Sequence, residues 1–239
     1  MNPEETGNVP GIVEQTISFL KYIHTNRVEL SPDFRLIENT SLREIARLFD
    51  PIAGRYGYLP DERHYPDVFF IDTLCRFSGM TSVAGDRLGV SQHGYLFLSR
   101  EAEKQLMMLA SAFVNDYPWH ILFPRGDLGK GLERRRGEVL DLISSLEPDV
   151  VVEVRSLCKT LSGNLEIELS DENPPYPTLI FEWAVRHILI APLSRLLILE
   201  LLTSDGNPAI DLKGCHSVRL SKSGKEILTK REVRYKGKR

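Results

Sequence analysis

The chain has few of the residues that build disulfides or metal sites. Its three cysteines, Cys75, Cys158 and Cys215, are far apart, and no Cys-x-x-Cys spacing occurs. An odd number of isolated thiols does not fit a disulfide framework and is typical of the reducing cytoplasm. The six histidines include no pair at the i,i+4 spacing of helical zinc sites. The sequence therefore predicts no bound metal and no cofactor.

Long apolar runs and an export signal are also lacking. The most apolar stretch, residues 188–202, is too short to span a membrane and is interrupted by Pro192, Arg195 and Glu200. The first eight residues contain Glu4 and no basic stretch followed by an apolar run, so no secretory signal is expected. We therefore expect a cytoplasmic protein with no membrane partner.

Signatures of nucleophilic and phosphate chemistry are missing as well. No Gly-x-Ser-x-Gly motif occurs, and the glycine-rich segment 126–131 lacks the spacing of a phosphate-binding loop. The densest polar cluster, residues 61–67, combines three carboxylic acids with Arg63 and His64. Such a cluster could hold acid–base groups, but it is more typical of a solvated loop. We therefore predict that the protein is not an enzyme.

The composition is that of an ordinary globular protein. Of the 239 residues, 42% are hydrophobic and 26% are charged, which excludes long disordered or coiled-coil segments. The length suits two small domains, which we place at residues 1–118 and 119–239. Trp119 lies at this boundary and is expected to pack between the two domains.

In the first half, the pattern predicts three helices, a hairpin and a closing helix. The helices are expected over residues 11–24, 41–49, 68–80 and 100–115, with a short strand at 28–30. A capping box of Ser41 and Glu44 would open the second helix, and Ser99 would cap the last. The hairpin is expected within residues 81–98 and would end in the alternating segment 95–98.

The second half repeats this order. Helices are expected over residues 131–146, 153–161 and 179–191, strands over 196–202 and 216–220, and a polar loop over 170–177. A terminal helix would be capped at Ser221 or Ser223. The third of these helices is apolar almost all round.

Two internal matches support a duplication. Asp72-x-x-x-Arg76 corresponds to Glu182-x-x-x-Arg186 in the predicted third helices, and residues 96–99 correspond to residues 218–221 at a strand-to-helix corner. At i,i+4 spacing, the two acid–arginine pairs are expected to be surface ion pairs worth about 0.3–0.5 kcal/mol each. The sequence thus predicts two similar units.

These elements resemble the winged-helix superfamily, chiefly in the C-terminal half. The resemblance covers roughly residues 10–115 and 131–230. It is carried by Phe181-Glu182-Trp183, Pro192-Leu193, the run 196–201 and Val218-Arg219-Leu220-Ser221-x-x-Gly224-x-x-Ile227-Leu228. The last motif is similar to the Leu-Thr-x-x-Gly end common in that superfamily. The resemblance implies an α+β, predominantly helical chain of two tandem winged-helix-like domains, each of about three helices plus a β-hairpin wing.

Winged helices commonly bind nucleic acids, because the third helix fits a major groove and the wing reaches phosphates. The leading hypothesis is therefore a non-enzymatic regulatory or accessory protein that binds DNA or RNA. Charge favours the C-terminus for this role: residues 213–239 contain 10 Lys and Arg against 2 Asp and Glu, whereas residues 1–118 and 119–212 are net acidic. The candidate binding residues are Arg76, Arg186, Arg219, Lys222, Lys225, Lys230, Arg231, Arg234 and Lys236.

The predicted third helices also support an alternative. They offer few hydrogen-bond donors and include carboxylates at Asp72 and Glu182, which phosphates would repel. A protein-interaction module that uses its winged helices as docking surfaces suits such helices better, and its partner would be a protein. The basic C-terminus would then be a solvated tail. The sequence leaves the oligomeric state open.

Overall fold

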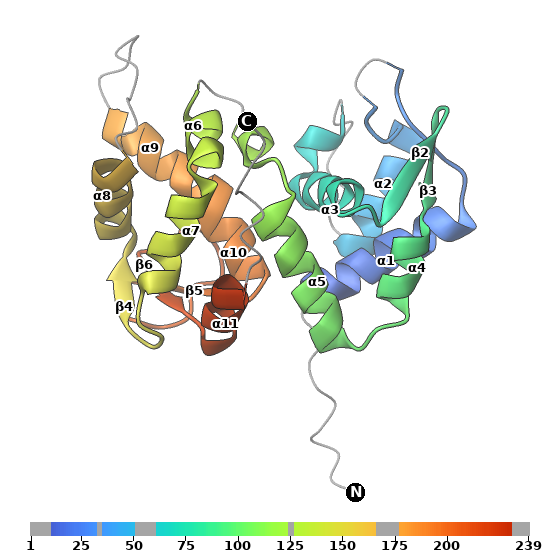
Figure 1. Cartoon of the computed structure of the whole chain (residues 1–239). Helices are drawn as coiled ribbons and strands as arrows, with labels where there is room; N and C mark the ends of the chain where they lie inside the picture. The colour runs from blue at the N-terminus through green and yellow to red at the C-terminus, as the bar shows by residue number, and fades with distance from the viewer. Residues whose placement is uncertain (1–10, 33–34, 51–60, 124–126, 166–176, 231–239) are drawn as a thin grey trace, which may run out of the picture. The chain divides into compact units, whose positions relative to one another are not determined.

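The chain folds as two compact units, Met1–Tyr117 (unit 1) and Pro118–Arg239 (unit 2). The computed structural model describes residues 11–32, 35–50, 61–123, 127–165 and 177–230 (Figure 1). It confirms a mixed α+β chain in which helices predominate and each unit contains one small antiparallel sheet.

Unit 1 begins with a helix that has one apolar face. Helix α1 (Gly11–Thr25) buries Val13, Phe19 and Leu20 completely. The spacing of these residues places them on one side of the helix, which packs against the next two helices and the sheet. The elements that follow are β1 (Val28–Glu29), α2 (Asn39–Phe49), the 3-10 turn η2 (Glu62–His64), α3 (Pro66–Phe77), β2 (Thr81–Ala84), β3 (Arg87–Val90), α4 (Gln92–Leu98) and α5 (Ala102–Asn115).

The sheet of unit 1 has the strand order β1-β3-β2. Val28 pairs with Leu88, and Thr81 pairs with Val90, so the hairpin carries the first strand on its outer side. Its tight turn contains Gly85 at φ +65°, a conformation that glycine adopts without strain. The hairpin expected from the sequence is therefore confirmed at residues 81–90.

Unit 2 repeats the sequence of helix, strand, two helices, hairpin and helix. Its elements are the 3-10 turn η3 (Trp119–Leu122), α6 (Leu128–Arg134), α7 (Arg136–Ser145), β4 (Val151–Glu153), α8 (Val154–Leu165), α9 (Pro177–Val185), the π-helical segment η4 (Arg186–Ile190), α10 (Ala191–Arg195), β5 (Leu199–Leu202), β6 (Ser217–Leu220) and α11 (Lys222–Lys230). Val218 pairs with both Val152 and Leu201, which gives the strand order β4-β6-β5.

The third helix of unit 2 changes its winding before a proline. The five residues Arg186–Ile190 are π-helical and lead into α10, whose second residue is Pro192. Proline has no backbone N–H and its ring clashes with the carbonyl four residues earlier, so regular α-helical bonding cannot continue through this point. The widened π turn accommodates the proline without ending the helix.

Both units share one strand-to-helix corner. In unit 1, the Ser91 hydroxyl donates to the Gly79 carbonyl (2.5 Å) and accepts from the Gly94 N–H (3.1 Å). In unit 2, the Ser221 hydroxyl donates to the Leu197 carbonyl (2.7 Å) and accepts from the Gly224 N–H (2.8 Å). The structural repeat is therefore Ser-x-x-Gly directly after the last strand of each hairpin.

This corner corrects one internal match. Residues 96–99 belong to α4 and its C-cap, not to a strand, so they do not correspond to residues 218–221. The alternating segment from Tyr95 to Leu98 is too short to separate strand from helix by periodicity. The Ser91 side chain caps the N-terminus of α4 and so stabilises a helix here. This helix buries Phe97 and leaves Tyr95 and Leu96 exposed.

Three helix starts also differ from the sequence expectation. Helix α2 begins at Asn39, so Ser41 is a buried residue of its first turn, and Glu44 accepts a hydrogen bond from Tyr22 (2.5 Å) and does not form a capping box. Ser99 caps the end of α4, whereas the N-cap of α5 is Glu101. The expected helix 131–146 is two helices that meet at Arg135.

Strand β4 (Val151–Glu153) was not expected, and its last residue, Glu153, was predicted to begin the following helix. Ser221 is confirmed as the cap of the terminal helix. The expected polar loop 170–177 lies almost wholly outside the described residues.

Leu197 carries a backbone strain that unit 1 avoids. Its φ is +56°, and the equivalent residue of the first corner is Gly79 at +73°. The left-handed conformation is unfavourable for an L-residue by about 1–2 kcal/mol, and the Leu197 side chain is nearly half exposed (46%). We expect Leu197→Gly to raise the free energy of unfolding of unit 2 by about 0.5–1 kcal/mol in urea titrations. Gly79→Ala should lower the free energy of unfolding of unit 1. A Leu197→Gly protein that is less stable than the unchanged chain would show that Leu197 carries no relievable backbone strain.

Candidate functional site

Two of the candidate nucleic-acid contacts are tied into the protein. The Arg76 guanidinium pairs with Asp72 (2.6 Å) and donates to the Arg35 carbonyl (2.7 Å). The Arg186 guanidinium pairs with Glu182 (2.8 Å) and donates to the Cys215 carbonyl (2.8 Å). Asp72 is 3% exposed and the other three side chains are 14–21% exposed, so these are not the surface ion pairs expected from their spacing. They fix loops to the third helices.

Four further candidates, on β6 and α11, have acceptors within the protein. Arg219 pairs with Glu200 (2.5 Å), which raises the pKa of its guanidinium. Lys225 donates to the Leu146 carbonyl (3.2 Å). Lys222 pairs with Asp149 at 3.5 Å, and Lys230 pairs with Glu226 at 3.1 Å. Arg231, Arg234 and Lys236 lie outside the described residues.

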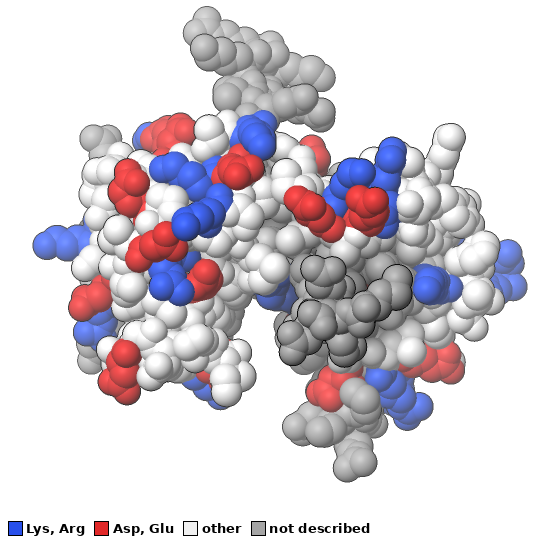
Figure 2. Space-filling model, turned by 90° about the horizontal axis from the view of Figure 1, so that it is seen from below, with Lys and Arg blue, Asp and Glu red and all other residues white. Residues whose placement is uncertain are grey.

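The described surface shows no broad basic face in the view of Figure 2. Lys and Arg side chains lie among Asp and Glu side chains in each unit. Mixed charges of this kind largely cancel beyond about 10 Å at ordinary salt. Long-range attraction of a polyanion by this face is therefore weak.

The third helices of the two units differ in exposure. In α3, the buried residues run without a break from Phe70 to Cys75, including the polar Asp72 and Thr73. The middle of α3 is therefore covered, and its exposed apolar residue, Phe77, lies at its end. In α9, by contrast, Leu179 is 53% exposed and Trp183 is 48% exposed. The two units therefore present different surfaces at the equivalent helix.

An exposed strip runs along α9 into the π-helical segment. Leu179, Trp183 and His187 follow one another at four-residue spacing and are all exposed. The Trp183 ring contacts the His187 ring (5.4 Å between centroids) and the buried Phe123 ring (5.8 Å), both edge to face. Burial and the nearby Arg186 lower the pKa of His187, which favours its neutral form. We call these three residues the α9 strip.

One edge of the α9 strip carries positive charge. Arg155 of α8 is 81% exposed and its Nε lies 3.6 Å from the Glu182 carboxylate. Lys159 follows one helical turn later and is also exposed. Helix α8 contains no Asp or Glu between residues 154 and 165. The α9 strip is thus an apolar surface with a basic border.

Sequence reasoning missed this strip. The pattern predicted a helix over residues 179–191 that is apolar almost all round, and it did not distinguish the exposed face of this helix from the buried one. The i,i+4,i+8 series of Leu179, Trp183 and His187 was the available signal. Trp119 lies under the Arg136 guanidinium (4.7 Å) and is fully buried.

A buried carboxyl pair lies in the polar cluster 61–67. Glu62 is fully buried, which corrects the expectation of a solvated loop. It accepts a hydrogen bond from the Ile37 N–H (2.8 Å) and shares one with Asp72. Burial, and then the charge of Asp72, raise the pKa of Glu62 well above its ordinary value. Both carboxyls are inaccessible, so the pair is structural. Asp61, in the same turn, binds Arg63, which lowers its pKa to about 2.

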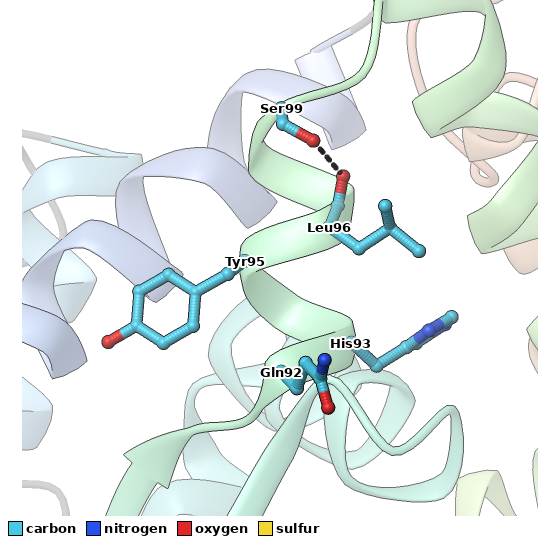
Figure 3. A pocket seen from close by; sticks show the side chains of 5 residues that line it. All are labelled: Gln92, His93, Tyr95, Leu96 and Ser99. Carbon is cyan, nitrogen blue, oxygen red and sulfur yellow. Dashed lines mark hydrogen bonds between the residues drawn. The ribbon is translucent and has the colours of Figure 1, made fainter.

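A hollow of about 520 Å³ lies beside α4 (Figure 3). It is lined by Gln92, His93, Tyr95, Leu96 and Ser99. The one hydrogen bond drawn among them joins Ser99 to the Leu96 carbonyl, and Tyr95 points away from Leu96 and His93 toward a hydrogen bond with His24 (2.9 Å). Pockets that bind small molecules usually combine apolar walls with converging polar groups. These five residues provide no such convergence.

The remaining reactive groups do not form a catalytic centre in the described parts. Cys75, Cys158 and Cys215 are buried, and burial raises each thiol pKa, that of Cys158 to about 12. Such thiols are poor nucleophiles. No group of His, Cys, Asp or Glu suited to a metal ion occurs among the described residues. Within the same residues, no helix has the length and apolar character needed to cross a membrane.

Comparison of the chain with protein families, curated proteins and solved structures found no match.

Proposed function

We propose that the chain is a non-enzymatic accessory protein of two tandem winged-helix units, and that it docks another protein on the α9 strip in the cytoplasm. The observation that carries the proposal is the exposure of Trp183 and Leu179 on the third helix of unit 2. Exposed tryptophans set among other apolar side chains are typical anchors of protein interfaces.

The winged-helix assignment is supported by the order of elements. Each unit has a helix, a strand, two helices and two hairpin strands, and in each sheet the first strand pairs with the last. The shared Ser-x-x-Gly corner adds a third likeness between the units. In winged helices, the third helix and the wing form the recognition surface.

Docking of a protein fits this recognition surface better than binding of DNA. The α9 strip offers two large exposed apolar side chains, Leu179 and Trp183, which cannot pair with phosphates. The six described candidate cations already have acceptors in the protein. Nucleic-acid binding remains the competing function because of the basic residues 213–239.

Affinity capture with the full chain tests the proposal. Trp183→Ala should reduce the affinity for the protein partner at least about 30-fold, because truncation of a central interface tryptophan costs about 2 kcal/mol or more. Phe77→Ala is the matched control, since Phe77 is 53% exposed on the third helix of unit 1. Recovery of the partner should survive nuclease treatment.

Direct binding to duplex DNA, single-stranded DNA and RNA distinguishes the competing function. If about six cations met phosphates, binding would weaken with salt at a log–log slope of about −5. Two results together would contradict docking on α9. These are nucleic-acid binding by the full chain at low salt, and capture of the protein partner by Trp183→Ala at the same level as by the unchanged chain.

A further inference from the structure

The charge around the α9 strip indicates what kind of protein it fits. Arg155 and Lys159 border the strip on the α8 side, and Arg155 touches Glu182 next to it. Helix α8 carries these two cations and no Asp or Glu between residues 154 and 165. This apolar strip is thus bordered by basic side chains on the α8 side.

The shape of the strip is that of a contact between two helices. Leu179, Trp183 and His187 span about 12 Å along one helix. Side chains at four-residue spacing form a ridge that packs against the groove of a second helix. An amphipathic partner helix would place its apolar face on Trp183 and its flanking side chains over Arg155 and Lys159.

On this basis, which rests on the proposed docking function, we propose that the α9 strip binds an acidic amphipathic helix of another protein. Carboxylates beside the apolar face of the partner would meet Arg155 and Lys159. A second copy of this chain fits less well, because Glu182, the carboxylate of α9 beside the strip, is only 14% exposed and is already paired with Arg186. Duplex DNA fits the cations but not the exposed Leu179 and Trp183.

Peptide selection tests the inference. A phage library of random 16-residue peptides is selected on the immobilised full chain and counter-selected on the Trp183→Asp variant. We expect enrichment of peptides with Asp or Glu and with Leu, Phe or Trp at i,i+4 spacing. The most enriched peptide is then synthesised with a fluorescein label and titrated with the full chain, with fluorescence anisotropy as the signal.

Charge reversal provides the decisive comparison. The double variant Arg155→Glu/Lys159→Glu should bind the peptide with about tenfold lower affinity. Added salt should also lower the affinity of the unchanged chain for the peptide. Lys222→Glu with Lys230→Glu is the matched control, because it changes the net charge equally on α11, which packs on α7. This control should leave binding within about twofold.

The other outcomes are distinguishable. Peptides that depend on Trp183 but lack acidic residues, or that ignore the Arg155/Lys159 reversal, would overturn the acidic partner while leaving docking on α9 intact. No Trp183-dependent peptide, or a duplex oligonucleotide that binds the strip in their place, would overturn both proposals. Circular dichroism melts confirm that each variant is folded.

Discussion

Glu62→Gln should raise the free energy of unfolding of unit 1 by about 1–3 kcal/mol at pH 8, because the folded protein must keep the buried Glu62 carboxyl protonated at this pH, whereas glutamine is neutral at every pH. Glu62 is fully buried beside Asp72, and Arg76 pairs with Asp72 at 2.6 Å. Glutamine keeps an oxygen for the Ile37 N–H and offers an N–H to Asp72. It therefore replaces the protonated acid with a neutral group of the same shape.

The sign of the pH dependence follows from the raised pKa of Glu62. In the unfolded chain this carboxyl ionises near its ordinary pKa of 4.5, whereas burial and Asp72 keep it protonated to higher pH in the folded protein. The folded state therefore binds more protons, and its stability falls as pH rises from about 4.5 through the folded pKa. Burial also raises the pKa of Asp72, against the effect of Arg76.

Urea titrations between pH 5 and pH 9 measure this effect. Circular dichroism is the suitable signal, because both tryptophans, Trp119 and Trp183, lie in unit 2. Glu62→Gln should flatten the decline of unit 1 stability with pH. Asp72→Asn is the contrasting variant and should destabilise by about 3–5 kcal/mol, because it leaves Arg76 without its buried partner. If the unfolding free energy of the Glu62→Gln protein depends on pH as steeply as that of the unchanged chain, Glu62 is ionised in the folded protein.

The order of elements could be predicted from the sequence where local signals agree. Helix α1 has one apolar face over four turns, and the turn of the first hairpin contains Gly85. Such patterns depend on the chain's own periodicity and not on distant contacts. The α+β class followed from them.

The candidate surfaces could not be predicted, because they depend on what covers each helix. The pattern of α9, which is apolar almost all round, does not reveal that the Trp183 side chain is exposed. Likewise, the polar cluster 61–67 does not reveal that Glu62 is buried. Both facts are set by packing between segments far apart in the chain. The Ser-x-x-Gly repeat at Ser91 and Ser221 was visible in the sequence, but the short alternation after it favoured a strand.

Gly224→Ala should lower the free energy of unfolding of unit 2 by about 3 kcal/mol, at the upper end of the range for overpacked positions. A Cβ at residue 224 would collide with the carbonyl oxygen, the carbonyl carbon and the Cα of Ile198. These are backbone atoms, and the Ile198 carbonyl also accepts the Ser221 N–H at 3.0 Å. They cannot withdraw without loss of the corner that joins β6 to α11.

The position of the tryptophans makes this prediction specific to one unit. The midpoint of urea unfolding, followed by tryptophan fluorescence, should fall for Gly224→Ala but stay unchanged for Gly94→Ala. In Gly94→Ala the added Cβ would meet the Met80 carbonyl, which lies in unit 1. Gly163→Ala is the control, because Gly163 lies in helix α8 with open space around its Cβ position. It should stabilise unit 2 by about 0.5–1 kcal/mol through helix propensity. Equal effects of the Gly163 and Gly224 substitutions would show that the close approach at Ile198 does not restrain this corner.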